Sequence, residues 1–158
     1  MAVDMFLKLD GIDGESTDKL HEKWIQVESF SWGVSNHVTT TSGGGGAGKA
    51  VPSDFSFVIP QSAASPDIFI KCVTGEHIKE GLLSCRKAGR DQSTDFLKYK
   101  LTDVLVSSYN TEGAGDQPME SISLNFVKID YSYAPQNADG SLGTPNEVSF
   151  DFEQFKTG

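Results

Sequence analysis

Residues 97–106 read LKYKLTDVLV, and this stretch decides the fold class. Apolar and polar residues alternate through Leu97, Tyr99 and Leu101, and after one slip in phase the alternation resumes at Val104 and Val106. A period of two is typical of a half-buried β-strand, and a single slip within a long strand indicates a β-bulge. The sequence therefore predicts a long strand with a bulge at this point.

The same alternation covers much of the chain, in runs at residues 5–9, 24–38, 55–59, 122–133 and 148–152. The second run changes phase near Glu28. Long strands with bulges favour a mainly β protein, with two sheets that form a single closed or nearly closed β-barrel. Because the 158 residues show no internal repeat and no break in composition, we expect one domain over residues 1–158.

One helix is predicted at about residues 65–74, flanking the barrel. Ser65 is a typical N-cap, Pro66 suits the first helical position, and Gly75 suits the end of the helix. A helix of this length is marginal alone, so we expect it to pack an apolar face on the barrel. The predicted members of that face are Ile68, Phe69, Cys72 and Val73.

The segment at about residues 39–51 does not fit a minimal barrel. Residues 39–50 read TTTSGGGGAGKA, which is polar and longer than an ordinary hairpin turn. The run matches parts of two phosphate-binding fingerprints, but no helical pattern follows it and Ala50 stands where a P-loop has a hydroxyl. We expect a long protruding loop and no nucleotide site.

Charge excludes some classes of partner. Thirteen Lys and Arg against 22 Asp and Glu give a net charge of −9, which disfavours nucleic acid and anionic lipid. No stretch approaches the roughly 18 apolar residues of a membrane span. The start Met1-Ala2-Val3-Asp4 has an acid where a signal peptide needs a cation, so we expect synthesis in the cytoplasm without a signal peptide.

No pattern predicts a catalytic, metal or cofactor site. The histidines, His21, His37 and His77, follow no metal-binding spacing, and we expect surface or structural roles for them. Glu15 and Asp18 offer a carboxylate pair for acid–base chemistry, but the neighbouring lysines favour a solvated turn. We therefore do not expect an enzyme.

The two cysteines, Cys72 and Cys85, form no CxxC motif. With His77 they would supply three metal ligands at a spacing that fits no known site. Cys72 lies in the apolar helical pattern, so we expect a buried thiol. Whether the two cysteines form a disulfide after export stays open at this stage.

Several stretches resemble the haemolysin-coregulated protein (Hcp) family of type VI secretion systems. They read GESTDK at 14–19 with His21 and FSWG at 30–33, SPD at 65–67 with RKAG at 86–89, and VLVSS at 104–108 with SLNF at 123–126. The similarity extends over nearly the whole chain. It implies a β-barrel with one flanking helix that assembles into six-membered rings.

The resemblance also implies a function. In the family, stacked rings form the inner tube of a contractile machine that has a sheath, a baseplate and a spike trimer at the tube tip. The tube is assembled in the cytoplasm and expelled, and its lumen holds small effector proteins. The resemblance therefore predicts a structural tube protein, without enzymatic activity, that is secreted.

The predicted loop is our candidate for contacts between protomers or between stacked rings. Ordering consecutive glycines costs roughly 1–2 kcal/mol each in backbone entropy, which a lone barrel does not offset. The candidate contact residues are Gly43, Gly44, Gly45, Gly46 and Lys49. The alternative is a monomeric or dimeric barrel that binds a carbohydrate, with Trp24 and Trp32 as stacking platforms.

Overall fold

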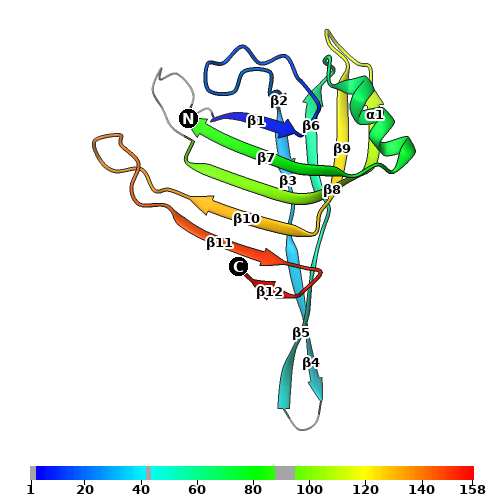
Figure 1. Cartoon of the computed structure of the whole chain (residues 1–158). Helices are drawn as coiled ribbons and strands as arrows, with labels where there is room; N and C mark the ends of the chain where they lie inside the picture. The colour runs from blue at the N-terminus through cyan, green and yellow to red at the C-terminus, as the bar shows by residue number, and fades with distance from the viewer. Residues whose placement is uncertain (1–2, 42–43, 88–94) are drawn as a thin grey trace.

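The structure, a computed structural model, describes residues 3–41, 44–87 and 95–158. Two sheets face each other, a helix lies at one side, and a hairpin extends away from the barrel (Figure 1). The elements are β1 (Val3–Leu9), β2 (Ile25–Val27), β3 (Ser29–Ser31), β4 (Val34–Thr41), β5 (Gly44–Pro52), β6 (Phe55–Pro60), α1 (Ser65–Thr74), β7 (Ile78–Lys87), β8 (Leu97–Glu112), β9 (Met119–Asn125), β10 (Lys128–Tyr133), β11 (Asn146–Asp151) and β12 (Lys156–Thr157).

The two sheets share β8. Its first half pairs with β7 and β10, and its second half pairs with β9. Between the halves, Asp103 has a left-handed φ of 56°, and the register with β9 shifts between Val106 and Ser108. The phase slip after Leu101 therefore marks the place where one strand leaves the first sheet and enters the second.

The first sheet has the order β12-β11-β10-β8-β7-β1-β2, and the second has the order β3-β6-β9-β8. The sheets approach each other again where β2 passes into β3 at Glu28, whose N–H donates to the Val58 carbonyl at 2.8 Å. The phase change near Glu28 is this second crossing. The predicted mainly β, nearly closed barrel of two sheets is confirmed.

Aromatic side chains fill the space between the sheets. Phe55, Phe57 and Ile59 alternate along β6 and are fully buried. Phe55 stacks on Phe57 and on Trp32, with ring centroids 4.9 and 5.7 Å apart, and Tyr99 meets it edge-on at 5.4 Å. Aromatic pairs in these geometries stabilise a core beyond the area that they bury. The period-two pattern thus identifies core residues correctly.

Helix α1 covers the predicted residues, but its first turn differs from the prediction. Ala64 is the N-cap and makes no side-chain capping bond, so the assignment of Ser65 as N-cap is wrong. Ser65 is the first helical residue, and its hydroxyl donates to the buried carboxylate of Glu120 instead. Gly75 ends the helix in the left-handed region with a φ of 71°, as expected.

The predicted apolar face of α1 is only partly buried. Ile68 is fully buried, and Cys72 is half-buried against the core. Phe69 touches β8 only through the edge of its ring and stays exposed, and Val73 is exposed as well, so the expectation that all four residues form a face buried on the barrel is wrong. The physical reason is geometric: five of the six residues from Ile68 to Val73 are apolar, and one short helix cannot turn them all toward the same side.

The segment predicted as an irregular loop at about 39–51 does protrude, but it is a paired hairpin. Thr39, Thr40 and Thr41 of β4 pair with glycines of β5 in a continuous antiparallel register. Threonine has a high strand propensity, and glycine lets the facing backbone approach closely. A Cβ on Gly48 would lie 1.9 Å from the His37 carbonyl oxygen, so this glycine is needed for the pairing.

Candidate functional site

The β4–β5 hairpin extends beyond both sheets (Figure 1). At its base, the Gly33 N–H donates to Ser53 Oγ at 2.9 Å, and the Ser53 N–H donates to the Gly33 carbonyl at 2.8 Å. An isolated two-stranded hairpin is only marginally stable in water. The hairpin is therefore a segment that a second surface would stabilise.

The candidate contact residues lie at different distances from the base of this hairpin. Gly44, Gly45 and Gly46 belong to β5, opposite the threonines of β4, whereas Gly43 lies outside the described residues. Lys49 lies nearer the base, where its Nζ is 4.9 Å from the centre of the Phe155 ring of the same chain. The structure thus places Lys49 in an intrachain cation–π contact, apart from the glycines.

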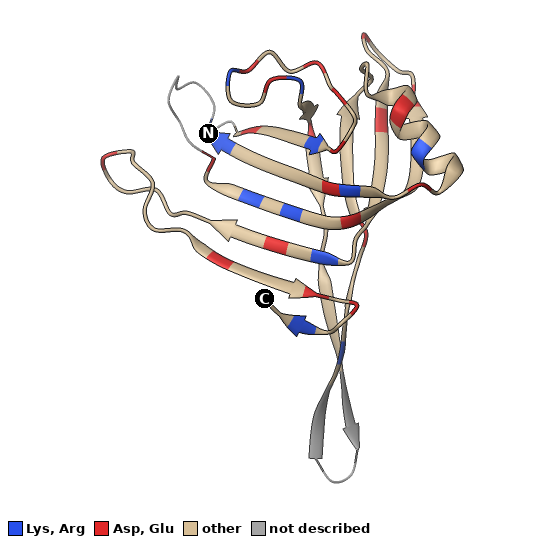
Figure 2. Ribbon diagram, viewed as in Figure 1, with Lys and Arg blue, Asp and Glu red and all other residues tan. Residues whose placement is uncertain are grey.

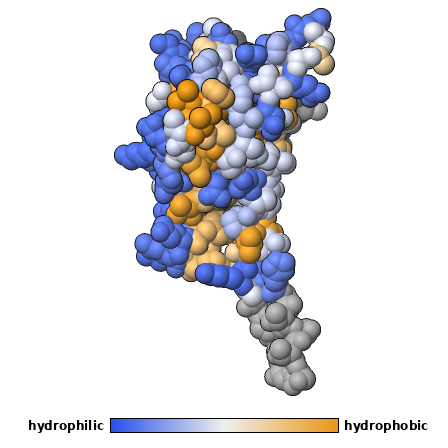
Figure 3. Space-filling view, turned by 90° about the vertical axis from the view of Figure 1, so that its right-hand side faces the viewer, coloured by the Kyte–Doolittle hydropathy of each residue, from blue (hydrophilic) through white to orange (hydrophobic). Residues whose placement is uncertain are grey.

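A second candidate surface is the outer side of α1. Phe69, Ile70 and Val73 are 47%, 50% and 66% exposed, and we call them the helix face. Figure 3 views the side of the molecule that carries α1 and shows apolar side chains gathered in the upper half of that side. Sequence analysis missed this surface. The sequence did contain the signal, because the apolar residues between Ile68 and Val73 are too many to lie on one side of a helix.

Helix α1, which carries the helix face, is attached to β8 and β9 by side-chain contacts. Glu120 is 1% exposed and accepts hydrogen bonds from the Ser65 hydroxyl and the Tyr109 hydroxyl. Burial raises the pKa of Tyr109, and its hydrogen bond to the Glu120 carboxylate raises it further. The Tyr109 ring also meets the Phe69 ring edge-on, with centroids 5.8 Å apart. These contacts fix α1 against β8 and β9.

A third candidate surface is an apolar groove of about 330 Å³ between the hairpin base and strands β10–β12. We call it the β10–β11 groove. Its apolar wall includes Trp32, Val34, Tyr131, Val148, Phe150 and Phe152. Ser149 and Thr157 contribute hydroxyl-bearing side chains, and none of the residues that line it is charged. Val34 and Val148 are 54% and 61% exposed, so the groove is open to solvent.

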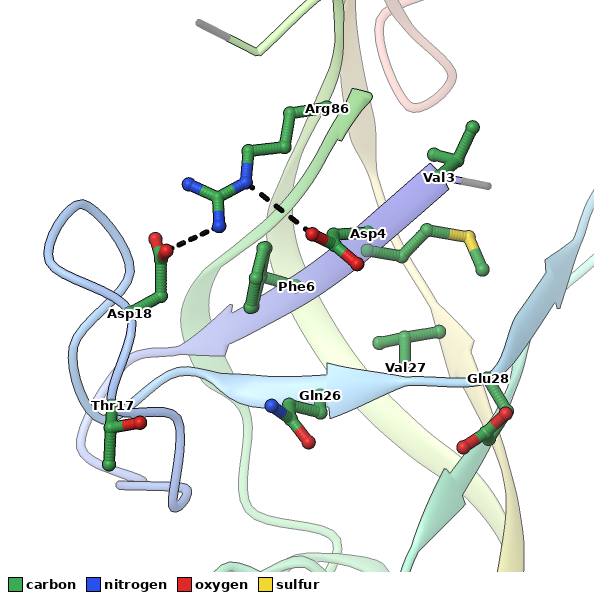
Figure 4. A pocket seen from close by; sticks show the side chains of 10 residues that line it. Val3, Asp4, Phe6, Thr17, Asp18, Gln26, Val27, Glu28 and Arg86 are labelled. Atoms are coloured by element: carbon green, nitrogen blue, oxygen red, sulfur yellow. Dashed lines mark hydrogen bonds and ion pairs between the residues drawn. The ribbon is translucent and has the colours of Figure 1, made fainter. Parts of the chain in front are cut away.

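A cluster of charged side chains binds the segment between β1 and β2 to the barrel. His21 is 1% exposed, with Nδ1 2.7 Å from Asp18 Oδ2 and Nε2 2.9 Å from Asp95 Oδ2. Its ring stacks on Phe6 at 4.3 Å. Arg86 pairs with Asp18, and beside them lies a polar cavity of about 460 Å³ (Figure 4). The prediction of a structural role for His21 is consistent with this burial.

Asp18 is not placed to act as a general acid. Burial opposes its ionisation, but hydrogen bonds from His21 and Arg86 outweigh that effect, and the pKa of Asp18 lies below its usual value. A general acid requires a raised pKa instead. Glu15, its suggested partner in the sequence, is exposed. The geometry therefore gives no support to acid–base chemistry by this pair.

The other residues considered for chemistry are dispersed. Cys72 and Cys85 are both free thiols, and burial raises the pKa of Cys85 to about 12, with a further contribution from Asp95. His77 pairs at the surface with Asp103, at 2.6 Å. Within the described residues, no group of three His, Cys, Asp or Glu side chains is arranged to hold a metal ion.

The two tryptophans are half-buried, and Trp32 also lines the β10–β11 groove. Trp24 meets the buried His21 ring edge-on at 4.9 Å. Trp32 stacks on Phe55 and meets Tyr99 edge-on, both at 5.7 Å. Both rings are engaged in aromatic contacts within the chain, which gives the carbohydrate-binding alternative no specific support.

Charge is mixed over the first sheet. Figure 2 shows Lys and Arg interspersed with Asp and Glu along β7, β8 and β10. Such a surface has no basic stripe of the kind that follows a phosphate backbone. Among the described residues, no helix has the length and apolar character to cross a membrane.

Comparison with known proteins identifies the family. The family model described as "Type VI secretion system effector, Hcp" matches residues 6–133. The chain is 39% identical to the protein hcp1 of Pseudomonas aeruginosa, over 98% of both chains. The chain belongs to the Hcp family.

Solved structures agree with this assignment. A structure titled as a type six secretion system protein matches 99% of this chain and 100% of its own, with a TM-score of 0.91 and 33% identity. Hcp1 from Salmonella typhimurium matches over the full length of both chains, with a TM-score of 0.84 and 32% identity. Hcp is a family of secreted type VI secretion proteins and is not a known enzyme family.

Proposed function

We propose that this Hcp-family chain is the structural subunit of a type VI secretion tube. Six copies close into a ring, rings stack into the inner tube, and the tube is expelled from the cytoplasm. The observation that carries the proposal is the family match over essentially the whole chain. The exposed hairpin, helix face and groove supply the unpaired surfaces that a subunit of an assembly needs.

The hairpin is the proposed contact between protomers or between stacked rings, through Gly43, Gly44, Gly45 and Gly46. Lys49 would contribute near the hairpin base. The outer edges of a two-stranded hairpin present backbone groups that another chain can pair with. Glycine also allows close approach of a second backbone.

The remaining partners follow from the family assignment. The tube would carry a spike trimer at its tip, lie within a contractile sheath on a baseplate, and hold small effector proteins in its lumen. No metal or cofactor is required for such a role. Binding of effectors inside the ring would use polar and charged side chains, which the first sheet presents along β7, β8 and β10 (Figure 2).

Native mass spectrometry of the purified protein at micromolar concentration tests the proposal. The expected result is a species six times the 17.1 kDa protomer, and electron microscopy should show rings with a central channel. A lone 17.1 kDa species across that concentration range contradicts the ring. A monomer or dimer that binds an oligosaccharide would instead support the carbohydrate-binding alternative.

A further inference from the structure

We propose that Lys49 and Phe155 form a clamp, which holds the β4–β5 hairpin to the turn between β11 and β12 and so sets the direction in which the hairpin leaves the barrel. Both are positioning residues, because they act on assembly through the hairpin and not by contact with another copy. The inference rests on the proposed role of the hairpin in the tube. It names the contact within one chain that orients the hairpin for that role.

Little of the described structure fixes the direction of the hairpin. Among the described residues, β4 and β5 pair with each other and with no other strand. The hydrogen bonds between Gly33 and Ser53 close the base of the hairpin, but they join its own two flanking residues. Val34 and Ala50 line the open β10–β11 groove, so packing does not close that side of the base. A tie elsewhere is needed to fix the direction of the hairpin.

Lys49 lies at a β-bulge of the hairpin. The register of β5 with β4 shifts between Asn36 and Val38. At the shift, two residues of β5, Gly48 and Lys49, lie opposite the single residue His37. A bulge bends the strand and turns a side chain away from the direction that a regular ladder would give it. The direction of the Lys49 side chain is therefore set by an irregularity in the strand.

Phe155 has an unusual backbone conformation. Its φ of 58° lies in the left-handed region, where turns normally use glycine or asparagine. Asp151 Oδ1 fixes the turn by accepting hydrogen bonds from the N–H groups of Glu153 and Gln154, at 2.9 and 2.8 Å. A glycine would adopt the same φ without steric cost. The phenylalanine is therefore explained by what its ring contacts, and not by the needs of the turn.

The Phe155 ring connects the hairpin to the barrel. It meets the Phe150 ring edge-on at 5.2 Å, and Phe150 meets Phe152, which packs against the core, at 4.9 Å. The Lys49 Nζ lies over the Phe155 ring, 4.9 Å from its centre. Among the described residues, no carboxylate lies within ion-pair distance of Lys49. The negative face of the ring is thus the partner of this ammonium group.

Two local irregularities that are far apart in the sequence therefore meet at one contact. In Figure 1, the turn between β11 and β12 lies beside the part of the hairpin that is nearest the barrel. An exposed cation–π contact shifts an equilibrium by about two- to fivefold. A shift of that size does not hold the barrel together, but it biases the direction of a hairpin that pairs with no other strand.

Hydrogen–deuterium exchange of the hairpin amides in the full chain tests the clamp. Lys49→Met removes the charge and keeps a long apolar side chain, and Phe155→Leu removes the ring and keeps an apolar side chain. Each should raise the exchange rate of the hairpin amides about two- to fivefold. The increase should be the same at low and high protein concentration, because the contact lies within one chain. The double variant should add little to either single change.

Three further variants separate the clamp from a merely structural effect. Lys49→Arg keeps the cation and Phe155→Tyr keeps the ring, so both should exchange like the wild type. Lys156→Met is the matched control, because it removes an exposed lysine next to Phe155 without changing the Lys49 contact. All variants should keep the wild-type circular dichroism spectrum. If Phe155→Leu disturbs the turn, Lys49→Met decides the test, since it leaves the turn unchanged.

Tube assembly is the second readout. Lys49→Met and Phe155→Leu should form shorter tubes in electron micrographs, whereas Lys49→Arg and Phe155→Tyr should form tubes of wild-type length. Unchanged exchange in Lys49→Met would overturn the clamp. Faster exchange with tubes of wild-type length would overturn its role in assembly. Failure of the proposed function looks different, because the wild type would then form no tubes while the exchange difference between Lys49→Met and the wild type remained.

Discussion

The segment at residues 10–24 and the β4–β5 hairpin both leave the barrel, and they are held in opposite ways. Residues 10–24 contain hardly any regular secondary structure, yet backbone bonds such as Lys23 N–H to the Ser16 carbonyl, at 2.8 Å, fold them tightly. The buried His21 then ties them to Asp95, two residues before β8 begins. The hairpin is a two-stranded ladder, and the hydrogen bonds at its base join its own flanking residues, Gly33 and Ser53, to each other.

The difference shows that regular hydrogen bonding and fixed position are separate properties. A buried cluster of charges fixes an irregular segment, because releasing any one member leaves its partners unpaired away from water. A two-stranded hairpin, here with one irregularity in its ladder between Asn36 and Val38, stays marginal until a further surface covers it. We therefore expect changes in the first segment to alter the stability of the protomer, and changes in the hairpin to alter its assembly.

The largest expected effect on the protomer is that of His21→Ala. The substitution leaves the carboxylates of Asp18 and Asp95 without the imidazole that bridges them, and it removes a ring stacked on Phe6. We expect a loss of about 3–5 kcal/mol in the free energy of unfolding, measured by urea titration. His77→Ala is the control, since that histidine pairs with Asp103 at an exposed site and should change stability by about 0–1 kcal/mol. Equal losses in the two variants would contradict the comparison.

The next effect concerns pH. Burial opposes ionisation of Asp18, but the hydrogen bonds from His21 and Arg86 outweigh the effect of burial. Together they hold the pKa of Asp18 below the usual 3.8. The charged form therefore stabilises the fold above pH 3.8, and this contribution is lost as the pH falls through the folded-state pKa. We expect Asp18→Asn to lower the free energy of unfolding by about 2 kcal/mol at neutral pH. The loss should be much smaller at a pH below the folded-state pKa of Asp18, where the wild-type carboxyl is protonated.

Urea titrations of the wild type and Asp18→Asn between pH 7 and pH 2 measure this difference, and the two curves should converge as the pH falls. Asp139→Asn is the matched control. The pKa of Asp139 is also lowered, chiefly by hydrogen bonds from Ser141, but that loop is exposed and solvent weakens the contribution. Parallel curves for the wild type and Asp18→Asn would show that the charge of Asp18 does not support the fold.

Much of the fold was readable from the sequence, because apolar side chains on a strand must alternate to face one core. The slips near Glu28 and after Leu101 even marked where strands cross between sheets, although they were interpreted only as bulges. The sequence could not show which side of α1 lacks a partner, since burial of Phe69 depends on what lies beside the helix. The sequence also did not distinguish Gly48 from its neighbours in the glycine run, although only a residue without a Cβ fits beside the His37 carbonyl at that position.

The smallest expected effect on the protomer, and the one that isolates assembly, is Gly48→Ala. A Cβ at this position would lie 1.9 Å from the His37 carbonyl oxygen, so the two strands of the hairpin must separate. The barrel core does not include the hairpin, and the free energy of unfolding of the protomer should change by no more than about 0.5 kcal/mol. Ring stacking, tube length in electron micrographs and the secreted amount should all fall.

Gly113→Ala is the control, because a Cβ there meets nothing within 4 Å. Deletion of residues 43–48 should reproduce the Gly48→Ala result. If both hairpin variants form tubes and are secreted like the wild type, the hairpin is not an assembly contact, and its extension beyond the barrel has no role in the tube.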